Sequence, residues 1–227
     1  MSKWFEVFKD MENEVKSFEG QFPLAEFEQA GFKQHPQITL LTCSDSRMPV
    51  NMFGPVFNRI FSAENIGNQF TINAGSILYG LLHLHTPLLI IAGHSDCGAV
   101  KAAESEFSGE PDAIRAELTT LKATLQEARE QYNPPLSDQG DIRATELAEL
   151  SVDMQIKYVL ANDEVKALVV QGDLAILGIM VDLHNIYKNG YGKFYITNLN
   201  GENQPELIKE KLPSGSAGER VKRLIVC

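Results

Sequence analysis

Two short apolar runs, each followed at once by a polar cluster, constrain the fold of this chain more than any other feature. The runs are residues 37–42 (QITLLT) and 87–93 (PLLIIAG), and the clusters are residues 43–47 (CSDSR) and 94–98 (HSDCG). The second run has the length and the Ile and Leu content of a strand that is buried on both faces. Strands of this kind belong to parallel sheets, which place their ligands just past the carboxyl ends of the strands.

Helical patterns separate the predicted strands. The expected strands are residues 37–42, 59–63, 87–93 and 174–183, with 192–197 as the hairpin partner of the last; the expected helices are residues 4–18, 74–84, 113–131 and 143–160. Residues 164–171 fit either a helix or a strand, because so short an apolar run has no decisive period. The alternation of strand, loop, helix and strand predicts βαβ units and a mainly parallel sheet.

Composition limits the class of protein. The chain has 227 residues, 44% of them hydrophobic, which can fill the core of one large domain or two small ones. Thirty acidic and 20 basic residues give a net charge of −10, which argues against a nucleic acid or an anionic membrane surface as partner. No apolar run approaches the roughly 20 residues of a membrane helix, and the first residues interleave charges where a signal peptide would be apolar. Three cysteines are too few for a disulfide-rich secreted fold, so we expect reduced thiols and a cytoplasmic location.

Two of the three cysteines lie just past predicted parallel strands. Since the carboxyl ends of neighbouring strands converge on one crevice, Cys43, His94 and Cys97 are expected to meet. Taken singly, each has an ordinary interpretation, because a lone buried cysteine usually acts as a small hydrophobic residue. Together, two thiolates and an imidazole form a zinc-ligand set that leaves a fourth position for water or substrate. Cys227 is expected to be a free thiol outside any site.

The two polar clusters resemble the signature segments of a known family. Residues 43–47 (CSDSR) and 93–100 (GHSDCGAV) are similar in sequence and spacing to the two signatures of the β-class carbonic anhydrases. The resemblance extends more thinly over about residues 36–195. Residues 65–68 (NIGN) resemble the Asn-rich segment after the family's second strand, and residues 177–182 (LGIMVD) resemble its late strand. This late match also indicates that residues 164–171 form a helix.

The resemblance implies a fold, an assembly and a ligand set. The fold would be a single α/β domain with a four-stranded, mainly parallel sheet core, flanking helices and an added antiparallel strand. Residues 1–35 would form an N-terminal helical arm, residues 36–200 the zinc-binding core, and residues 201–227 a C-terminal extension. Cys43, His94 and Cys97 would hold one zinc ion per subunit. The chain would form a homodimer or a dimer of dimers, with the N-terminal helix crossing to the partner subunit and the active cleft at the dimer interface.

The implied function is the reversible hydration of carbon dioxide to bicarbonate and a proton, by attack of zinc-bound hydroxide. Zinc lowers the pKa of a bound water toward about 7. Two thiolates neutralise the charge of the ion, whereas three imidazoles would not, so we expect hydroxide to form less readily here than at a three-histidine site. We expect Asp45 to accept the hydrogen bond of the hydroxide and so orient its lone pair. Arg47 would hold Asp45 in a charge-assisted pair. If that pair breaks, Asp45 would become the fourth zinc ligand in a closed state of the site.

Two positions depart from the family's pattern. Glu64 stands where the family commonly has a basic residue, which in one subclass forms a noncatalytic bicarbonate pocket, so we expect no such pocket here. Leu78 stands where the family often has an acidic residue. Ser44 and Asp96, inside the signatures, are expected to hydrogen-bond ligands or backbone. The sequence singles out no proton shuttle among the histidines His35, His83, His85 and His184.

Two other functions fit the same residues. A hydrolase of carbonyl sulfide or carbon disulfide would use the same fold and the same attack, and the apolar access to the site would distinguish it. A noncatalytic zinc-binding oligomer would keep Asp45 permanently on the metal. The pairing of Asp45 with Arg47 argues against that second alternative, because a purely structural site has no need of an arginine that withdraws its fourth ligand.

Overall fold

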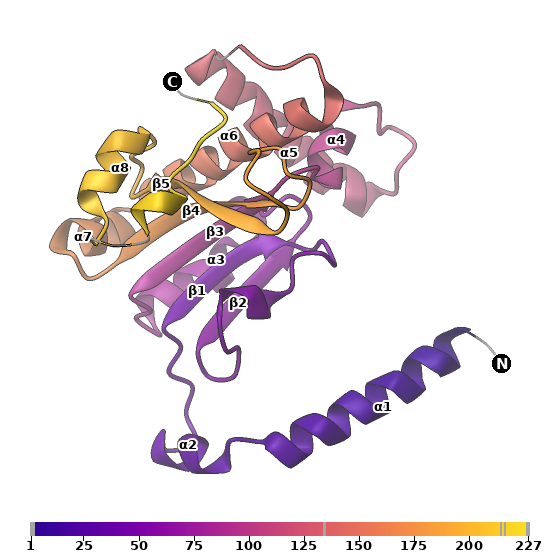
Figure 1. The fold of residues 1–227 in the computed structure, drawn as a ribbon, viewed down its shortest axis with the longest axis vertical. Coiled ribbons are helices and arrows are strands. Elements are labelled where there is room, and N and C mark those ends of the chain that lie inside the picture. Colours follow the sequence, from indigo (N-terminus) through magenta and orange to yellow (C-terminus); the bar gives the residue numbers. More distant parts are fainter. Residues whose placement is uncertain (1–2, 134, 214, 216, 226–227) are drawn as a thin grey trace. The chain divides into compact units, whose positions relative to one another are not determined.

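The structure, a computed structural model, describes residues 3–133, 135–213, 215 and 217–225 (Figure 1). Its residues group into two compact units, Met1–His35 and Pro36–Cys227. The first unit contains helices α1 (Lys3–Gln21) and α2 (Leu24–Gln29). All strands and the remaining helices belong to the second unit, which also carries both signature segments.

A five-stranded sheet in the order β2-β1-β3-β4-β5 forms the centre of the second unit. The strands are β1 (Ile38–Cys43), β2 (Ile60–Asn65), β3 (Leu88–His94), β4 (Ala175–Asp182) and β5 (Lys193–Leu199). The first four strands run parallel to their neighbours, and β5 pairs antiparallel with β4. The α/β class and the mainly parallel sheet with one added antiparallel strand are therefore confirmed.

Helices cover the sheet unequally. They are α3 (Phe70–Leu82), α4 (Gly98–Glu104), α5 (Asp112–Tyr132), α6 (Gly140–Leu160), α7 (Asp163–Gln171) and α8 (Pro205–Lys211). Alternate strand residues such as Leu41 and Ile91 join the large core beneath α3, α5 and α6. Their neighbours Leu40 and Ile90 face the other side, where they pack with Met48 from the loop after β1.

Two glycines let α6 approach the sheet closely. A Cβ at Gly93 would lie 2.8 Å from the Met180 sulfur and 2.9 Å from a Val152 methyl carbon. A Cβ at Gly178 would lie 2.9 Å from the other Val152 methyl carbon and 2.8 Å from Cβ of Asn198. These distances are shorter than van der Waals contact, so larger residues would push α6 away. Close packing of α6 on β3 fixes the strand that ends in His94.

Tertiary contacts explain where the structure differs from the sequence-based boundaries. Helix α3 is kinked at Asn73, whose φ of −112° and ψ of 21° are not helical, so a first turn from Phe70 precedes the part that begins at the predicted Ala74. The Gln155 side chain of α6 supports this first turn by accepting a hydrogen bond from the Phe70 N–H at 2.8 Å. The ambiguous residues 164–171 lie within α7, whose N-terminus is capped by Asn162. The polar stretch after residue 201 also forms a helix, α8, which buries Ile208 in a small cluster with residues of β5.

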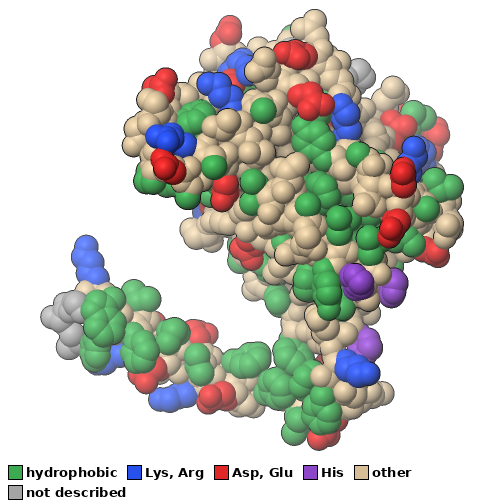
Figure 2. Space-filling view, turned by 180° about the vertical axis from the view of Figure 1, so that it is seen from behind, with side chains coloured by type: hydrophobic (Ala, Val, Ile, Leu, Met, Phe, Trp, Pro, Cys, Tyr) green, Lys and Arg blue, Asp and Glu red, His purple; other side chains and the backbone are tan. Residues whose placement is uncertain are grey.

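The N-terminal unit exposes a row of large apolar side chains. No residue of α1 is buried, and Trp4 is 67% and Met11 49% exposed. Trp4, Val7, Phe8, Met11 and Val15 recur at intervals of one to four residues, mostly three or four, and hydrophobic side chains follow the helix in Figure 2. None of the described helices combines the length and apolar character needed to cross a bilayer. The crossing of α1 to a partner subunit stays a prediction.

Candidate metal centre

The three predicted ligands meet at one edge of the sheet. Cys43 is the last residue of β1 and His94 the last of β3, and these two strands are parallel neighbours. Cys97 follows three residues later and precedes α4. One potential ligand atom from each of the three residues lies within 4.8 Å of the others, and all three residues are buried. Among the described residues this is the one group of three or more histidine, cysteine and acidic side chains close enough to hold a metal ion.

The turn after β2 supports the Cys43 sulfur. The Asn65 side-chain amide accepts a hydrogen bond from the Gln69 N–H at 2.7 Å and donates one to the Gln69 carbonyl at 2.8 Å, and so closes the turn. The Gly67 N–H then donates to Cys43 Sγ at 3.4 Å. Gly67 has a φ of +79°, and a Cβ there would lie 2.8 Å from a Leu121 methyl carbon, so both conformation and space require glycine.

The two cysteines share one negative charge. The pKa of Cys43 is lowered to about 4, chiefly by a hydrogen bond from the Cys97 thiol and further by His94 and the Gly67 N–H, although burial opposes the shift. The pKa of Cys97 is raised well above its ordinary value, because its proton is held by Cys43 and because it is buried. A divalent cation in place of this shared proton would balance both thiolates.

The His94 ring is oriented as a metal ligand. Its Nδ1 lies 3.0 Å from the Ser95 carbonyl oxygen, which can only accept, so Nδ1 carries the proton. In the neutral ring the lone pair is therefore on Nε2, which is buried and makes no hydrogen bond with the described residues. A buried polar atom of this kind is rare unless a ligand satisfies it. Two sulfurs and this nitrogen fit a tetrahedral zinc ion with one position left over.

Asp45 and Arg47 form a bidentate pair beside the cluster. Arg47 Nε donates to Asp45 Oδ1 at 2.9 Å and Arg47 Nη2 donates to Oδ2 at 2.6 Å. The Arg47 backbone N–H also donates to Oδ1 at 2.9 Å. These bonds hold the pKa of Asp45 far below its usual range, so the group is a carboxylate. Its Oδ2 lies 3.7 Å from His94 Nε2, near the cluster but outside the group of potential ligands.

A second carboxylate, Asp96, joins groups that the sequence did not connect. It lies 3.6 Å from Arg47 Nη1 and 3.5 Å from His184 Nε2, and it also pairs with Lys101. Burial raises the pKa of Asp96, but Lys101, and then His184 and Arg47, outweigh that effect and lower it. We expected Asp96 to bind ligands or backbone, whereas its carboxylate contacts three side chains. The position of His184 after β4, the strand next to β3, was the available signal for this contact.

The remaining candidates lie apart from the cluster. His83 and His85 follow α3, before β3 begins, and His35 belongs to the N-terminal unit. Cys227 lies outside the described residues. Glu64 and Glu117 line a pocket of about 350 Å³ next to Ser44, where their carboxylates disfavour an anion.

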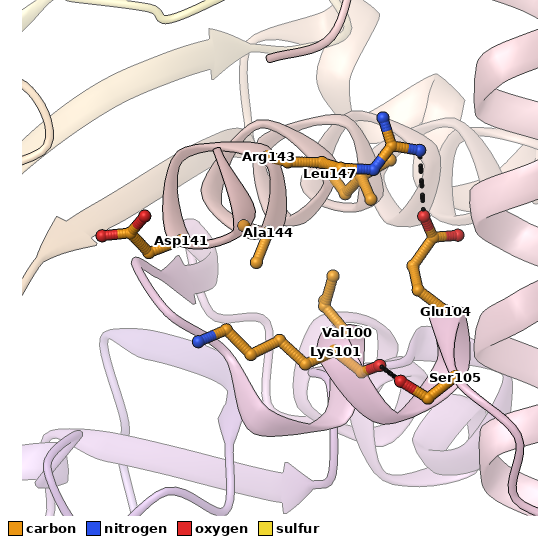
Figure 3. Close-up of a pocket in the computed structure, with 9 residues that line it drawn as sticks. Val100, Lys101, Glu104, Ser105, Asp141, Arg143, Ala144 and Leu147 are labelled. Atoms are coloured by element: carbon orange, nitrogen blue, oxygen red, sulfur yellow. Dashed lines mark hydrogen bonds and ion pairs between the residues drawn. The ribbon is translucent and has the colours of Figure 1, made fainter. Parts of the chain in front are cut away.

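Another pocket, of about 390 Å³, lies between α4 and α6 (Figure 3). It contains none of the three potential ligands. Its two cationic side chains are already paired, Arg143 with Glu104 at 3.1 Å and Lys101 with Asp96. The chemistry of the molecule therefore centres on the cysteine and histidine cluster rather than on this pocket.

Comparison with known proteins agrees with the geometry. A sequence model described as carbonic anhydrase matches residues 38–188, which contain both signature segments. The chain belongs to the carbonic anhydrase family. A carbonic anhydrase of Synechococcus elongatus is 26% identical over 171 residues, 70% of this chain and 61% of the relative, so the chain spans less than two thirds of its length. A carbonic anhydrase of Helicobacter pylori is 23% identical over 226 residues, 93% of this chain and 98% of the relative.

Solved structures place the fold in the β class of this family. A tetrameric β-carbonic anhydrase of Sordaria macrospora superposes with a TM-score of 0.68 at 22% identity, over 86% of this chain and 97% of the other. The β-carbonic anhydrase CafA of Aspergillus fumigatus has a TM-score of 0.68 at 21% identity, over 98% of this chain and the whole of the other. The predicted family is confirmed.

Proposed function

We propose that this carbonic anhydrase family member is a zinc-dependent enzyme that hydrates carbon dioxide reversibly to bicarbonate and a proton. The observation that carries the proposal is the unsatisfied, buried Nε2 of His94 beside two cysteine sulfurs, with Asp45 turned to Arg47. Cys43, His94 and Cys97 would hold one zinc ion per subunit. A zinc ion in such a site makes a hydroxide nucleophile available near neutral pH.

Asp45 and Arg47 would prepare the site for this reaction. An ionised Asp45 carboxylate can accept one hydrogen bond from the attacking oxygen and thereby fix the direction of its lone pair. Arg47 donates hydrogen bonds to both oxygens of Asp45. These bonds would keep the carboxylate near the cluster but away from the fourth ligand position. In a closed state, Asp45 would leave Arg47 and take the fourth ligand position.

The pairing of Asp45 with Arg47 argues against a noncatalytic role. A metal site that serves structure alone fills its coordination sphere with protein ligands. Here the nearest additional ligand, Asp45, is held by three hydrogen bonds from Arg47. Hydrolysis of carbonyl sulfide or carbon disulfide at this site is the alternative reaction to be assayed alongside.

The assembly and location belong to the same proposal. We infer a homodimer or a dimer of dimers in the cytoplasm, whose reducing conditions keep Cys43 and Cys97 available as thiolates. The exposed apolar side chains of α1 support an assembly in which this helix crosses to the partner subunit. The domain would comprise the arm 1–35, the zinc-binding core 36–200 and the C-terminal extension 201–227.

The test combines metal analysis with kinetics. Zinc content and stopped-flow hydration of carbon dioxide are measured for the wild-type protein and for Asp45→Asn. We expect about one zinc per chain in both, and a rate that falls by about 10² in the variant, the usual effect of removing one positioned polar group. Equal rates in the wild type and Asp45→Asn would keep the proposed activity but exclude the role of Asp45. A zinc-replete wild type without activity would contradict the function itself.

A further inference from the structure

We propose that Tyr187 and Ser95 are positioning residues that hold the His94 ring in the orientation in which it binds zinc. They connect this ring to a buried carboxylate and to the C-terminal segment, residues 221–225, through a continuous series of hydrogen bonds. The proposal rests on the zinc site of the proposed function. It assigns a role to buried groups that the hydration reaction itself does not use.

Ser95 is the member of this series that contacts the metal ligand. Its carbonyl oxygen lies 3.0 Å from His94 Nδ1, so the direction of this carbonyl sets the direction of the ring. The Ser95 N–H donates to the Val181 carbonyl at 2.9 Å. The Ser95 hydroxyl oxygen accepts from the Leu183 N–H at 2.8 Å and lies 3.1 Å from His184 Nδ1. The end of β4 and the loop after it therefore fix the position of Ser95.

The loop after β4 is folded around one carboxylate. Asp182 Oδ1 accepts from the N–H groups of His184 and Ile186, at 3.3 and 2.8 Å. Its Oδ2 accepts from the Tyr187 N–H at 2.8 Å. The Lys222 ammonium group donates to the Tyr187 carbonyl from the C-terminal segment. A loop closed in this way transmits the position of its last residue to its first.

A buried carboxylate of α6 fixes the far end of this loop. The Tyr187 hydroxyl donates to Glu149 Oε2 at 2.5 Å. The Leu224 N–H donates to the same oxygen and the Ile225 N–H to Oε1, each at 3.1 Å. Arg223 Nε lies 3.5 Å from Oε1. Glu149 thus gathers donors from the loop and from the C-terminal segment at one point, and it keeps three of them when the Tyr187 hydroxyl is removed.

The direction of the ring matters because a histidine binds a metal ion only when its lone pair points at the ion. A partner on the second ring nitrogen fixes this direction, and its loss typically lowers metal affinity by about 10- to 100-fold. Ser95, Tyr187 and Glu149 are all buried, so water cannot easily replace the hydrogen bonds that connect them. A change at Tyr187 should therefore weaken zinc binding although every ligand is still present.

Zinc release tests this series with a readout that does not require turnover. The rate at which zinc passes to an excess of a coloured chelator is measured for the wild type, Tyr187→Phe, Ser95→Ala and the double variant. We expect release to be about tenfold faster in Tyr187→Phe and faster still in Ser95→Ala, as for other partners of metal ligands. Because Tyr187 acts through Ser95, the double variant should release zinc no faster than Ser95→Ala alone.

Two control variants separate positioning from a general loss of stability. Tyr195→Phe removes the hydroxyl of the ring that stacks on Tyr187 with centroids 4.4 Å apart, and this hydroxyl is not among the donors to Glu149. Val165→Ala weakens the core at α7, which precedes β4 and lies at the other end of that strand from the loop. Both variants should release zinc at the wild-type rate, and urea denaturation is measured for each.

The outcomes distinguish this proposal from the proposed function. Wild-type release from Tyr187→Phe, equal acceleration in Val165→Ala, or effects of Tyr187→Phe and Ser95→Ala that multiply in the double variant would each overturn the positioning role. Tyr187→Phe and its two controls decide the matter even where Ser95→Ala does not fold. A zinc-loaded wild type that fails to hydrate carbon dioxide would contradict the proposed function and leave this test intact. A wild type that takes up no zinc would overturn both.

Discussion

A single aspartate and a single arginine pair beside the candidate metal site. Asp45 is close enough to His94 to matter for the metal centre, yet among the described residues its carboxylate accepts hydrogen bonds from Arg47 alone. Bidentate pairing adds direction as well as strength, which an ammonium group cannot reproduce. In the proposed mechanism, control of the fourth ligand position would rest on the planar guanidinium of one residue.

Removal of the Arg47 guanidinium should inactivate the enzyme without loss of zinc from the site. For Arg47→Ala we expect hydration to fall by about 10² to 10³, comparable with the loss of one preorganised donor. Zinc content should be unchanged, because none of the three sulfur and nitrogen ligands is altered. Arg47→Lys should regain part of the rate at most, since lysine offers a point charge rather than a fork. An alanine variant as active as wild type would exclude this role of Arg47.

At the residue scale, the sequence predicted the cluster but only part of its surroundings. Cys43, His94 and Cys97 could be placed together because parallel strands end at a common edge. The contact of His184 with Ser95 and Asp96 joins segments about 90 residues apart in the sequence, and no local pattern encodes it. Long-range pairs of this kind depend on loop conformations that neighbouring residues do not determine.

At the scale of elements, the packing of α6 on the sheet connects the core to the site. Gly93 and Gly178 leave room for Val152 of α6 against two adjacent strands. We predict that Gly178→Ala lowers the free energy of unfolding by about 1–3 kcal/mol, the usual cost of overpacking a core. Urea denaturation measures the change. Gly140→Ala, whose Cβ meets nothing within 4 Å, is the control and should leave stability unchanged or slightly raised. Equal stability of both variants would argue against close packing at Gly178.

A buried arginine near the C-terminus, Arg223, joins the C-terminal segment to α6. Arg223 Nη2 lies 2.7 Å from Asp153 Oδ2 in α6, and Arg223 Nε lies 3.5 Å from Glu149 Oε1. All three side chains are almost fully buried. Arg223→Ala would leave two buried carboxylates without their cation, so the free energy of unfolding should fall by about 3–5 kcal/mol. Lys209→Ala, which breaks an exposed pair with Glu206, should change it by less than about 0.5 kcal/mol. Similar changes in both variants would contradict this account.

Strong local patterns predicted most elements, and tertiary contacts explain the others. The apolar strands β1 and β3 and the long helices α5 and α6 follow from their residue content and periodicity. The extra turn of α3 before the kink at Asn73 is supported by Gln155, and α8 depends on burial of Ile208 beside β5. Neither contact can be inferred from residues 70–82 or 205–211 alone.

At the scale of the whole molecule, the proposed assembly depends on α1, whose large apolar side chains are exposed. Large apolar side chains exposed in a row mark interaction surfaces. If a second copy of the chain covers them, Phe8→Asp combined with Val15→Asp should shift the protein toward monomer in light scattering after size-exclusion chromatography. Glu6→Lys alters charge on the other side of α1 from the apolar row and should keep the assembly of the wild type. An unchanged mass of the double variant would show that α1 does not hold the assembly together.

Hydration by the metal-loaded protein tests the central claim most directly. Stopped-flow rates are measured at about pH 8.5, where hydroxide at a zinc site is available, first with one zinc per chain and then on the same protein after a chelator has removed the metal. We predict saturable hydration of carbon dioxide that disappears with the zinc and returns when zinc is restored. No rate above the uncatalysed reaction in the zinc-replete protein would contradict the account.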